Sequence, residues 1–588
     1  MDTQTPKKPG PKGWRAFFRT IKNIKLPWVW IIVGLSINLV LNDMMLKLPD
    51  LTASLTSGKL SGSSLTLAII YYIILSIMSF VAVAGQTQAQ TWSIKATRKS
   101  VWNKMLGMKM DHFDRNDPSD LMSAIINDAN TSVNSFVNII IYLIPDIYYV
   151  IAAMFRINQY HWILMLSCLA MLPLKYLYAL LLGKQFQKST AKLYSKIGLL
   201  TSFLADRINH LPLIKTYTNE EYEGEKGKEA ADKLLKANMK LVHLDNITTA
   251  ASSVLDILQK FIVIVIAVIL LQKQQIDLAM WIAFFFFAQN LFPTMDSIFD
   301  VWIRIKGMHG SFERIIEIMD GDDEEDSTAA KPFPKTGDIK FENITFTYPE
   351  TDEPAVKNIS FTVPRGSNVA IVGLCGSGKT TSVSLFERFY SPDVGRIMIG
   401  DTDIKDISLS DFRKNLAYVQ QGAEVFSGTL REALTYGIDR DVSDEEIYSA
   451  AERTGFNEYL ALCDDGLNTD VASGGTSMSG GQSQRLVLTR EVLRGGDIIL
   501  MDEPTSALDV RVSAKIQDTM DTVFADKTKI LITHDLSLAK RYSRIIVMEN
   551  GKIVGDGTDE ELLQSCETYR IMNKNAGETV ENEGGAEE

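Results

Sequence analysis

Residue types suited to phosphate chemistry form a continuous run near the middle of the C-terminal half. Glycines in such a run let backbone N–H groups surround phosphate oxygens, while a lysine reaches the β- and γ-phosphates and a hydroxyl ligates Mg²⁺. We expect Lys379 to contact the phosphates and Thr380 to contact Mg²⁺. The predicted nucleotide-binding residues are Gly373, Leu374, Cys375, Gly376, Ser377, Gly378, Lys379, Thr380 and Thr381.

Two further runs follow in the chain. Ile498–Met501 is apolar and ends in Asp502 and Glu503, as expected of a buried strand that brings carboxylates to a metal–phosphate site. Between this strand and the phosphate loop lies the run Ser479, Gly480, Gly481 and Gln482. Each run alone has an ordinary structural explanation, as a turn, a linker or a strand end. Their combination and order predict nucleotide hydrolysis, with the two carboxylates at the metal–phosphate site.

Composition limits the possible partners. The 588 residues include 60 basic and 72 acidic ones, and the net charge of −12 argues against nucleic acid as a partner. Cys168, Cys375, Cys463 and Cys566 are far apart, so we expect neither a disulfide framework nor a zinc site. We see no pattern of a cleavable signal before the first apolar stretch.

The N-terminal half predicts a membrane domain. Six apolar stretches each approach the roughly 20 residues that a helix needs to cross a bilayer. Asp256 and Lys260 interrupt the fifth stretch. The predicted spans are residues 28–46, 65–84, 136–155, 162–182, 254–271 and 278–295.

Charge gives an expected orientation. Basic residues precede the first span, so we expect the N-terminus and the C-terminal half in the cytoplasm and the chain in the inner or plasma membrane. The long loops after the second and fourth spans are predicted to be helical. The expected domains are a basic segment with an interfacial helix (1–26), the transmembrane domain (27–318), an acidic linker (319–336), the nucleotide-binding domain (337–573) and an acidic tail (574–588).

This arrangement resembles the ABC exporter half-transporters, a group that contains bacterial multidrug and lipid exporters. The resemblance rests on the phosphate loop, the Ser479–Gln482 signature and the acidic strand in that order, following six spans with two long loops. It implies a six-helix all-α transmembrane domain followed by an α/β ATPase domain of the phosphate-loop class. It further implies the use of ATP and Mg²⁺ and the export of an amphipathic drug, lipid or peptide across a lipid bilayer.

The resemblance also assigns roles to single residues. It implies that Asp502 orients Mg²⁺ and that Glu503 acts as general base towards the attacking water. Tyr348 matches the aromatic residue that stacks on adenine, and His534 matches the histidine that contacts the γ-phosphate. Gln421 matches the glutamine at Mg²⁺ or the attacking water, and Asp509 lies in the loop that links the two active sites of a dimer. The signature residues Ser479, Gly480, Gly481 and Gln482 are implied to contact ATP held by the opposite subunit.

A dimer is therefore implied, and the residues favour a homodimer because Glu503, His534 and the signature occur in one chain; a heterodimer remains open. Three positions depart from the family pattern. Met478 replaces a leucine, Ser473 replaces a glutamate that contacts the partner's transmission helices, and Cys375 lies inside the phosphate loop.

The cargo is the least determined feature of the sequence. Asp146, Lys175 and Asp296 are ionisable groups at or near membrane depth, where charges are costly and normally face a cavity or a partner. They could line a substrate path or pair with one another. Two alternative functions stay open: an ATP-gated channel or regulatory subunit, and an importer with the exporter fold.

Overall fold

A computed structural model describes residues 14–56, 62–115, 118–324, 331–349, 351–420, 422, 424–472, 478–504 and 510–574. The chain divides into two compact units. The N-terminal unit comprises Met1–Leu106 and Pro118–Gly321, and the C-terminal unit comprises Gly107–Asp117 and Asp322–Glu588.

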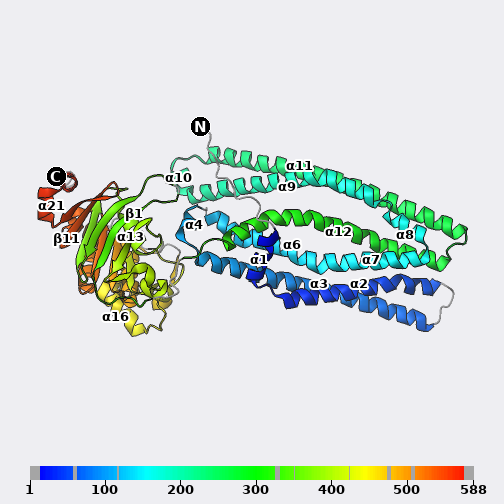
Figure 1. Ribbon diagram of the computed structural model, residues 1–588, viewed down its shortest axis with the longest axis horizontal. Helices are drawn as coiled ribbons and strands as arrows, with labels where there is room; N and C mark the ends of the chain where they lie inside the picture. The colour runs from blue at the N-terminus through cyan, green and yellow to red at the C-terminus, as the bar shows by residue number, and fades with distance from the viewer. Residues whose placement is uncertain are drawn as a thin grey trace. The chain divides into compact units, whose positions relative to one another are not determined.

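The described part of the N-terminal unit is helical. Its long helices run side by side, with α2 against α3 and α9 against α11 (Figure 1). Two π-helical turns, η1 and η2, interrupt the third apolar helix. The elements are α1 (Trp14–Ile24), α2 (Trp28–Thr56), α3 (Gly62–Leu106), α5 (Pro118–Ser123), η1 (Ala124–Asp128), α6 (Ala129–Asn138), η2 (Ile139–Leu143), α7 (Ile144–Tyr160), α8 (Trp162–Leu169), α9 (Leu172–Asn209), α10 (Leu211–Thr216), α11 (Glu220–Gln272) and α12 (Leu278–Met319).

Five helical stretches within the described ranges are long and apolar enough to cross a membrane: Trp28–Ala53, Leu65–Leu106, Leu121–Tyr160, Glu220–Gln272 and Leu278–Ile298. The predicted span 162–182 differs from these. It is divided between α8 and α9, with a turn at Ala170–Met171. Pro173 lies in the first turn of α9, where its missing N–H and fixed φ suit a helix start but not a helix interior.

Helix α1 packs its apolar face against its own unit. Phe17, Ile21 and Ile24 are buried, and the Phe17 ring lies 4.4 Å from that of Phe312. Arg19 donates to both carboxylate oxygens of Asp320, at 2.6 and 2.7 Å. This helix therefore offers only its other side, including exposed Phe18, to a membrane surface.

The C-terminal unit is built on a six-stranded sheet of order β12-β11-β3-β10-β9-β6 and a four-stranded sheet of order β2-β1-β4-β5. The inner strands β3, β9 and β10 pair in parallel and are almost entirely buried, because their alternate residues pack into two separate apolar clusters. A two-stranded sheet pairs β7 with β8.

The strands are β1 (Ile339–Phe346), β2 (Val356–Val363), β3 (Asn368–Gly373), β4 (Val394–Ile399), β5 (Thr402–Asp403), β6 (Leu416–Val419), β7 (Gly428–Thr429), β8 (Asp470–Val471), β9 (Ile498–Asp502), β10 (Thr528–Thr533), β11 (Arg544–Glu549) and β12 (Lys552–Gly557). The helices are α4 (Met110–Arg115), α13 (Lys379–Phe386), α14 (Leu409–Lys414), α15 (Leu430–Leu434), α16 (Asp444–Thr454), α17 (Asn457–Leu460), α18 (Gly480–Arg494), α19 (Val510–Val523), α20 (Leu536–Ala539) and α21 (Asp559–Ser565), with 3₁₀ turns η3 (Ile404–Asp406) and η4 (Gly466–Asn468).

The described start of the acidic linker is tied to the C-terminal unit. The Glu324 amide donates to the Gly107 carbonyl at 2.8 Å, and both Glu324 carboxylate oxygens accept from Arg413, at 2.9 and 3.0 Å. Arg413 also donates to the carbonyl of Glu387, just after α13. Since α13 starts at the phosphate loop, one arginine joins the linker to the helix that holds that loop.

Glu387 predicts a pH dependence of stability. Burial raises the pKa of its carboxyl to about 8, although Arg413 opposes the shift. The folded protein then keeps a proton that the unfolded chain loses from about pH 4.5, so the stabilisation present below that pH is lost as pH rises towards 8. We expect Glu387→Gln to flatten the decline in the melting temperature of the C-terminal unit between pH 5 and 8 in the purified full chain. In wild type, the contribution of Glu387 to the free energy of unfolding falls by at most about 1.4 kcal/mol per pH unit. The same pH profile of the melting temperature in Glu387→Gln and wild type would contradict the assignment.

Candidate ATP-hydrolysis site

The predicted phosphate loop connects β3 to α13. Its closing residue Gly378 has φ 98°, and Gly373 lies so near the Met548 carbonyl that a Cβ there would approach it to 2.3 Å. Glycine is therefore required at both positions. The Lys379 ammonium is buried beneath the loop and donates to the carbonyls of Gly373 and Leu374, at 2.8 and 3.0 Å. The lysine is thus held at the loop that was predicted to bind phosphate.

The acidic strand ends beside this loop. β9 is buried along its whole length and pairs with β10, so Asp502 and Glu503 emerge at the same sheet edge as His534, which follows β10. The His534 Nδ1 lies 2.8 Å from Glu503 Oε1. Glu503 has φ 45° and its amide donates to the Ile532 carbonyl at 2.9 Å. The backbone therefore turns at Glu503 and presents its carboxylate to His534.

The electrostatics couple these residues. Burial lowers the pKa of Lys379, and the nearby Glu503 and Asp502 carboxylates oppose that shift. Burial also raises the pKa of Asp502, with the Glu503 charge adding to the rise, while Lys379 and a hydrogen bond from Thr380 lower it. The cluster contains two carboxylates and one buried ammonium, which suits a site that binds a phosphate–metal complex.

Mg²⁺ and phosphate fit the donor set. The Thr380 hydroxyl and the Asp502 carboxylate are hydrogen-bonded to each other and are the oxygen ligands that Mg²⁺ prefers. The Ser377 hydroxyl is buried in the loop, and the described residues offer it no hydrogen-bond partner. An unsatisfied buried hydroxyl calls for a ligand oxygen, and a phosphate oxygen meets that need.

Tyr348 lies beside α13, the helix that follows the phosphate loop. Its hydroxyl is 3.3 Å from the Thr381 hydroxyl, and its ring meets Phe346 and Tyr390 edge-on, with centroids 5.0 and 5.2 Å away. Tyr390 also donates to the Asp114 carboxylate of α4 at 2.6 Å. The sequence offered no signal for this last contact, since it joins residues far apart in the chain.

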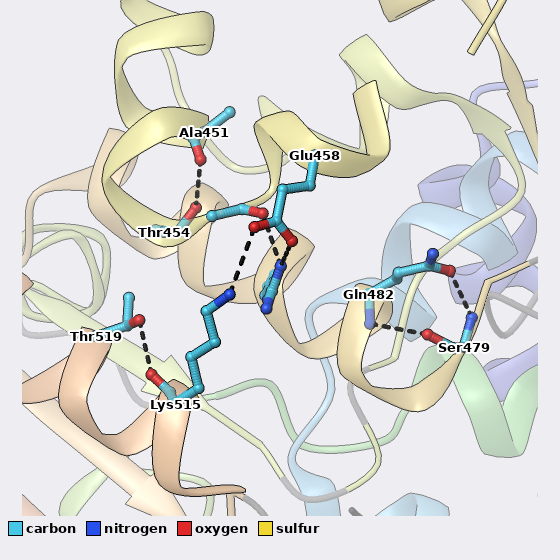
Figure 2. Close-up of polar contacts among 9 residues, drawn as sticks. Ala451, Thr454, Glu458, Ser479, Gln482, Lys515 and Thr519 are labelled. Carbon is cyan, nitrogen blue, oxygen red and sulfur yellow. Dashed lines mark hydrogen bonds and ion pairs between the residues drawn. The ribbon is translucent and has the colours of Figure 1, made fainter. Parts of the chain in front are cut away.

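The signature run begins helix α18. Ser479 is its N-cap, and Ser479 and Gln482 form a capping box: the Ser479 amide donates to Gln482 Oε1 at 2.8 Å, and the Gln482 amide donates to Ser479 Oγ at 3.4 Å (Figure 2). Ser479 and Gly480 are exposed. The capping box therefore fixes the conformation of the first turn of α18, and this turn is exposed. An anion that approaches from solvent could reach its backbone N–H groups.

Arg485 anchors the same helix. It donates to the Glu458 carboxylate at 2.7 Å and to the Gly455 carbonyl at 2.8 Å, and Lys515 reaches Glu458 from the other side at 3.4 Å (Figure 2).

Gln421, Asp509 and Ser473 lie outside the described residues. Their predicted roles remain predictions.

The ionisable residues predicted at membrane depth have polar partners within their own unit. Lys175 is 7% exposed and donates to Asp296 at 2.8 Å and to Asp256 at 2.7 Å. Asp146 accepts from Ser297 at 2.9 Å. The pairing that the sequence left open is therefore present for Lys175 and Asp296, whereas Asp146 contacts a serine. Asp256, which the sequence showed only as an interruption of the fifth span, joins this pair.

Cys375 gives a chemical test of the loop. Its thiol is exposed, whereas Cys168 and Cys566 are buried. We expect a maleimide to abolish ATPase activity by placing a bulky adduct among the phosphate-binding amides, and we expect ATP to protect against it. Mass spectrometry should show the adduct on Cys375, and Cys375→Ser should resist inactivation. Full turnover after stoichiometric labelling would refute this.

Both halves of the chain match families of known proteins. Residues 31–295 match the family of ABC transporter transmembrane regions, and residues 356–506 match the ABC transporter ATPase family. A lipid A-core flippase of Thiobacillus denitrificans is 28% identical over 498 residues, covering 85% of this chain and 86% of the relative. A multidrug resistance ABC transporter of Lactococcus lactis is 25% identical, covering 94% of both chains.

Among solved structures, a bacterial Atm1-family ABC exporter with ATP bound has the same fold, with a TM-score of 0.80 at 20% identity over 96% of this chain and 99% of the other. The transmembrane match, the ATPase match and the shared fold together cover nearly the whole sequence. The chain therefore belongs to the ABC transporter family, as a half-transporter of the exporter type that carries one transmembrane domain and one ATPase domain.

Proposed function

We propose that two copies of this chain form an exporter that moves an amphipathic lipid or drug across a bilayer at the expense of ATP. The observation that supports it most is the meeting of Lys379, Asp502, Glu503 and His534 at one sheet edge, in a chain that also carries membrane-length helices. The relatives named as lipid A-core flippases and as a multidrug transporter support this class of cargo.

Within each site we assign the residues of this chain to separate tasks. Lys379 and the loop amides bind the phosphates, while Thr380 and Asp502 would hold Mg²⁺, with Gln421 completing the set. Glu503 accepts a proton from the attacking water, and His534 fixes the Glu503 carboxylate and contacts the γ-phosphate. Tyr348 stacks on the base. Mg²⁺ supplies charge neutralisation of the phosphates when it is bound.

The second half of each site comes from the partner chain. Ser479 and the following glycines present a hydroxyl and backbone N–H groups at the open start of α18. Facing the phosphate loop of the partner, they would close over the γ-phosphate, and Asp509 would lie where the two sites communicate. Two ATPase domains then bind each other tightly only with ATP between them, and this differential binding drives the membrane helices between states.

The test is transport in reconstituted vesicles with the ATPase domain exposed outside. A fluorescent lipid and a cationic dye serve as candidate cargoes. Accumulation in the lumen that needs ATP and stops in Glu503→Gln supports export from the cytoplasmic side. ATP-driven loss of cargo from the lumen would indicate import, and ion current without uphill accumulation would indicate a channel; either result overturns the proposal.

A further inference from the structure

Asp146 is a carboxylate in the middle of a predicted span. At 1.5 Å per residue it lies about 15 Å from one end of the span 136–155 and about 14 Å from the other. The hydrocarbon layer is about 30 Å thick, and an aspartate side chain is too short to reach its edge from that depth. Since charges at membrane depth face a cavity or a partner rather than lipid, Asp146 requires a partner away from the lipid.

The side of α7 that carries Asp146 faces other helices of the same unit. Its carboxylate accepts hydrogen bonds from Ser297 of α12, at 2.9 Å, and from Asn42 of α2. Ile144 and Ile147, which point to other sides of α7, are exposed and suit lipid. Both hydrogen-bond partners of Asp146 are neutral, and the half-buried carboxylate can accept further bonds.

Opposite charges lie beside the other charged residues of the predicted spans, which are Asp43, Lys175, Asp256 and Lys260. Asp43 pairs with Lys47 at 2.7 Å. Lys175 binds Asp256 and Asp296, and Lys260, one turn after Asp256 on α11, balances the second of these carboxylates. Asp146 differs, because no lysine or arginine pairs with it in the part of the chain that the structure describes. Its charge is left for a partner from outside this chain.

Two tyrosines flank Asp146 on the same side of its helix. Tyr142 lies one turn before it and Tyr149 one turn after it. Tyr149 is 2% exposed, and the described residues offer its hydroxyl no hydrogen-bond partner. A buried hydroxyl without a partner calls for a ligand, and aromatic faces attract organic cations. A carboxylate between two phenol rings therefore suits a positively charged organic group.

The backbone before Asp146 departs from a regular α-helix. The π-helical turn η2 ends at Leu143, and Pro145 contributes no N–H to the next turn. Such turns occur often at functional sites. Irregular backbone at membrane depth is tolerated where it is buried in protein or lines a water-filled cavity. The local backbone thus agrees with a site that faces away from lipid.

We propose that Asp146 binds the positive charge of an amphiphilic organic cation, at a membrane-depth site to which α2, α7 and α12 contribute. Asn42 and Ser297 hold the carboxylate in place, and the Tyr142 and Tyr149 rings lie against the cation. The inference rests on the proposed transport function, because it names the class of the cargo.

Tritiated tetraphenylphosphonium, an apolar cation, is a direct probe of this site. The full chain in phosphatidylcholine nanodiscs, without nucleotide, is titrated in a scintillation proximity assay, and the signal of empty nanodiscs is subtracted. We expect saturable binding that dodecyltrimethylammonium displaces and triphenylphosphine oxide, a neutral molecule of similar shape, does not. Absence of saturable binding, or equal displacement by the neutral molecule, would overturn the inference.

Three variants test the role of the carboxylate. Asp146→Asn should weaken binding of the probe by about tenfold or more, since it removes the charge that faces the cation, and Asp146→Glu should keep binding. Asp277→Asn is the matched control: it makes the same change at the exposed N-cap of α12, where asparagine caps equally well, and should leave affinity unaltered. Equal affinity in Asp146→Asn and wild type would contradict the assignment. Binding of a fluorescent ATP analogue checks that each variant is folded; if Asp146→Asn fails this check, displacement by the neutral molecule decides.

Two further arms separate the kinds of cation and the hypotheses. Displacement of the probe by sodium chloride, but not by the same concentration of potassium or lithium chloride, would assign the site to an inorganic cation and overturn the inference. ATP-driven transport of a cargo by a protein that does not bind the probe would refute the cation site alone. Asp146-dependent binding in a protein without ATP-driven transport would refute the transport function alone.

Discussion

Glu503→Gln is expected to lower ATP turnover by about a hundred- to ten-thousand-fold, the range that general base catalysis contributes. The amide is nearly the same size as the carboxylate and keeps a hydrogen bond to His534, but it cannot accept the proton of the attacking water. Glu503 follows the buried strand β9 and its own side chain is only partly buried, so the substitution should leave the fold intact. Steady-state phosphate release measures the loss.

The same variant should still bind nucleotide, because Lys379 and the loop amides are unaltered. We expect ATP to accumulate unhydrolysed in the protein, which equilibrium binding of a fluorescent ATP analogue can show. Glu342→Gln is a matched control: it makes the same chemical change on β1, where Glu342 pairs with Arg396 at the surface. Turnover that survives in Glu503→Gln would remove the catalytic assignment, and loss in both variants would point to misfolding.

Features carried by short local sequence were predictable. The phosphate loop needs glycines because a Cβ would clash or strain the backbone there, so the loop can be recognised from its glycine spacing. The apolar run before Asp502 likewise predicts a buried strand whatever surrounds it. Parallel pairing of β9 with β10 then brings Glu503 and His534 to one edge. The candidate site was thus predictable because each part depends on local pattern and on a common sheet geometry.

Features that depend on packing between distant segments were not predictable. Lys175 could be recognised as costly in a membrane, but its choice of Asp256 and Asp296 depends on how α9, α11 and α12 pack. The break between α8 and α9 was missed because hydropathy is continuous across Ala170–Met171 and only Pro173 marks it.

Mixing two inactive variants should restore ATP hydrolysis if each site is shared between chains. Lys379→Ala removes the ammonium that the loop carbonyls hold, and Ser479→Arg fills the open start of α18 with a bulky side chain. Each homodimer has two damaged sites and should be nearly inactive. In the mixed dimer both defects fall on one site, and the other combines an intact loop with an intact signature. We expect this dimer to recover about half of wild-type turnover if the sites act independently.

The mixed dimer is isolated through two different affinity tags, and phosphate release is compared with that of each parent. A dimer of Lys379→Ala with Glu503→Gln is the matched control. Both of these residues act on the nucleotide held by their own chain, so each site keeps one defect and no recovery should occur. If neither mixture recovers, or if both recover equally, the signature does not act across the interface. Recovery in the first mixture alone requires Ser479 to act on ATP bound by Lys379 of the other chain, because a site confined to one chain would stay damaged in both.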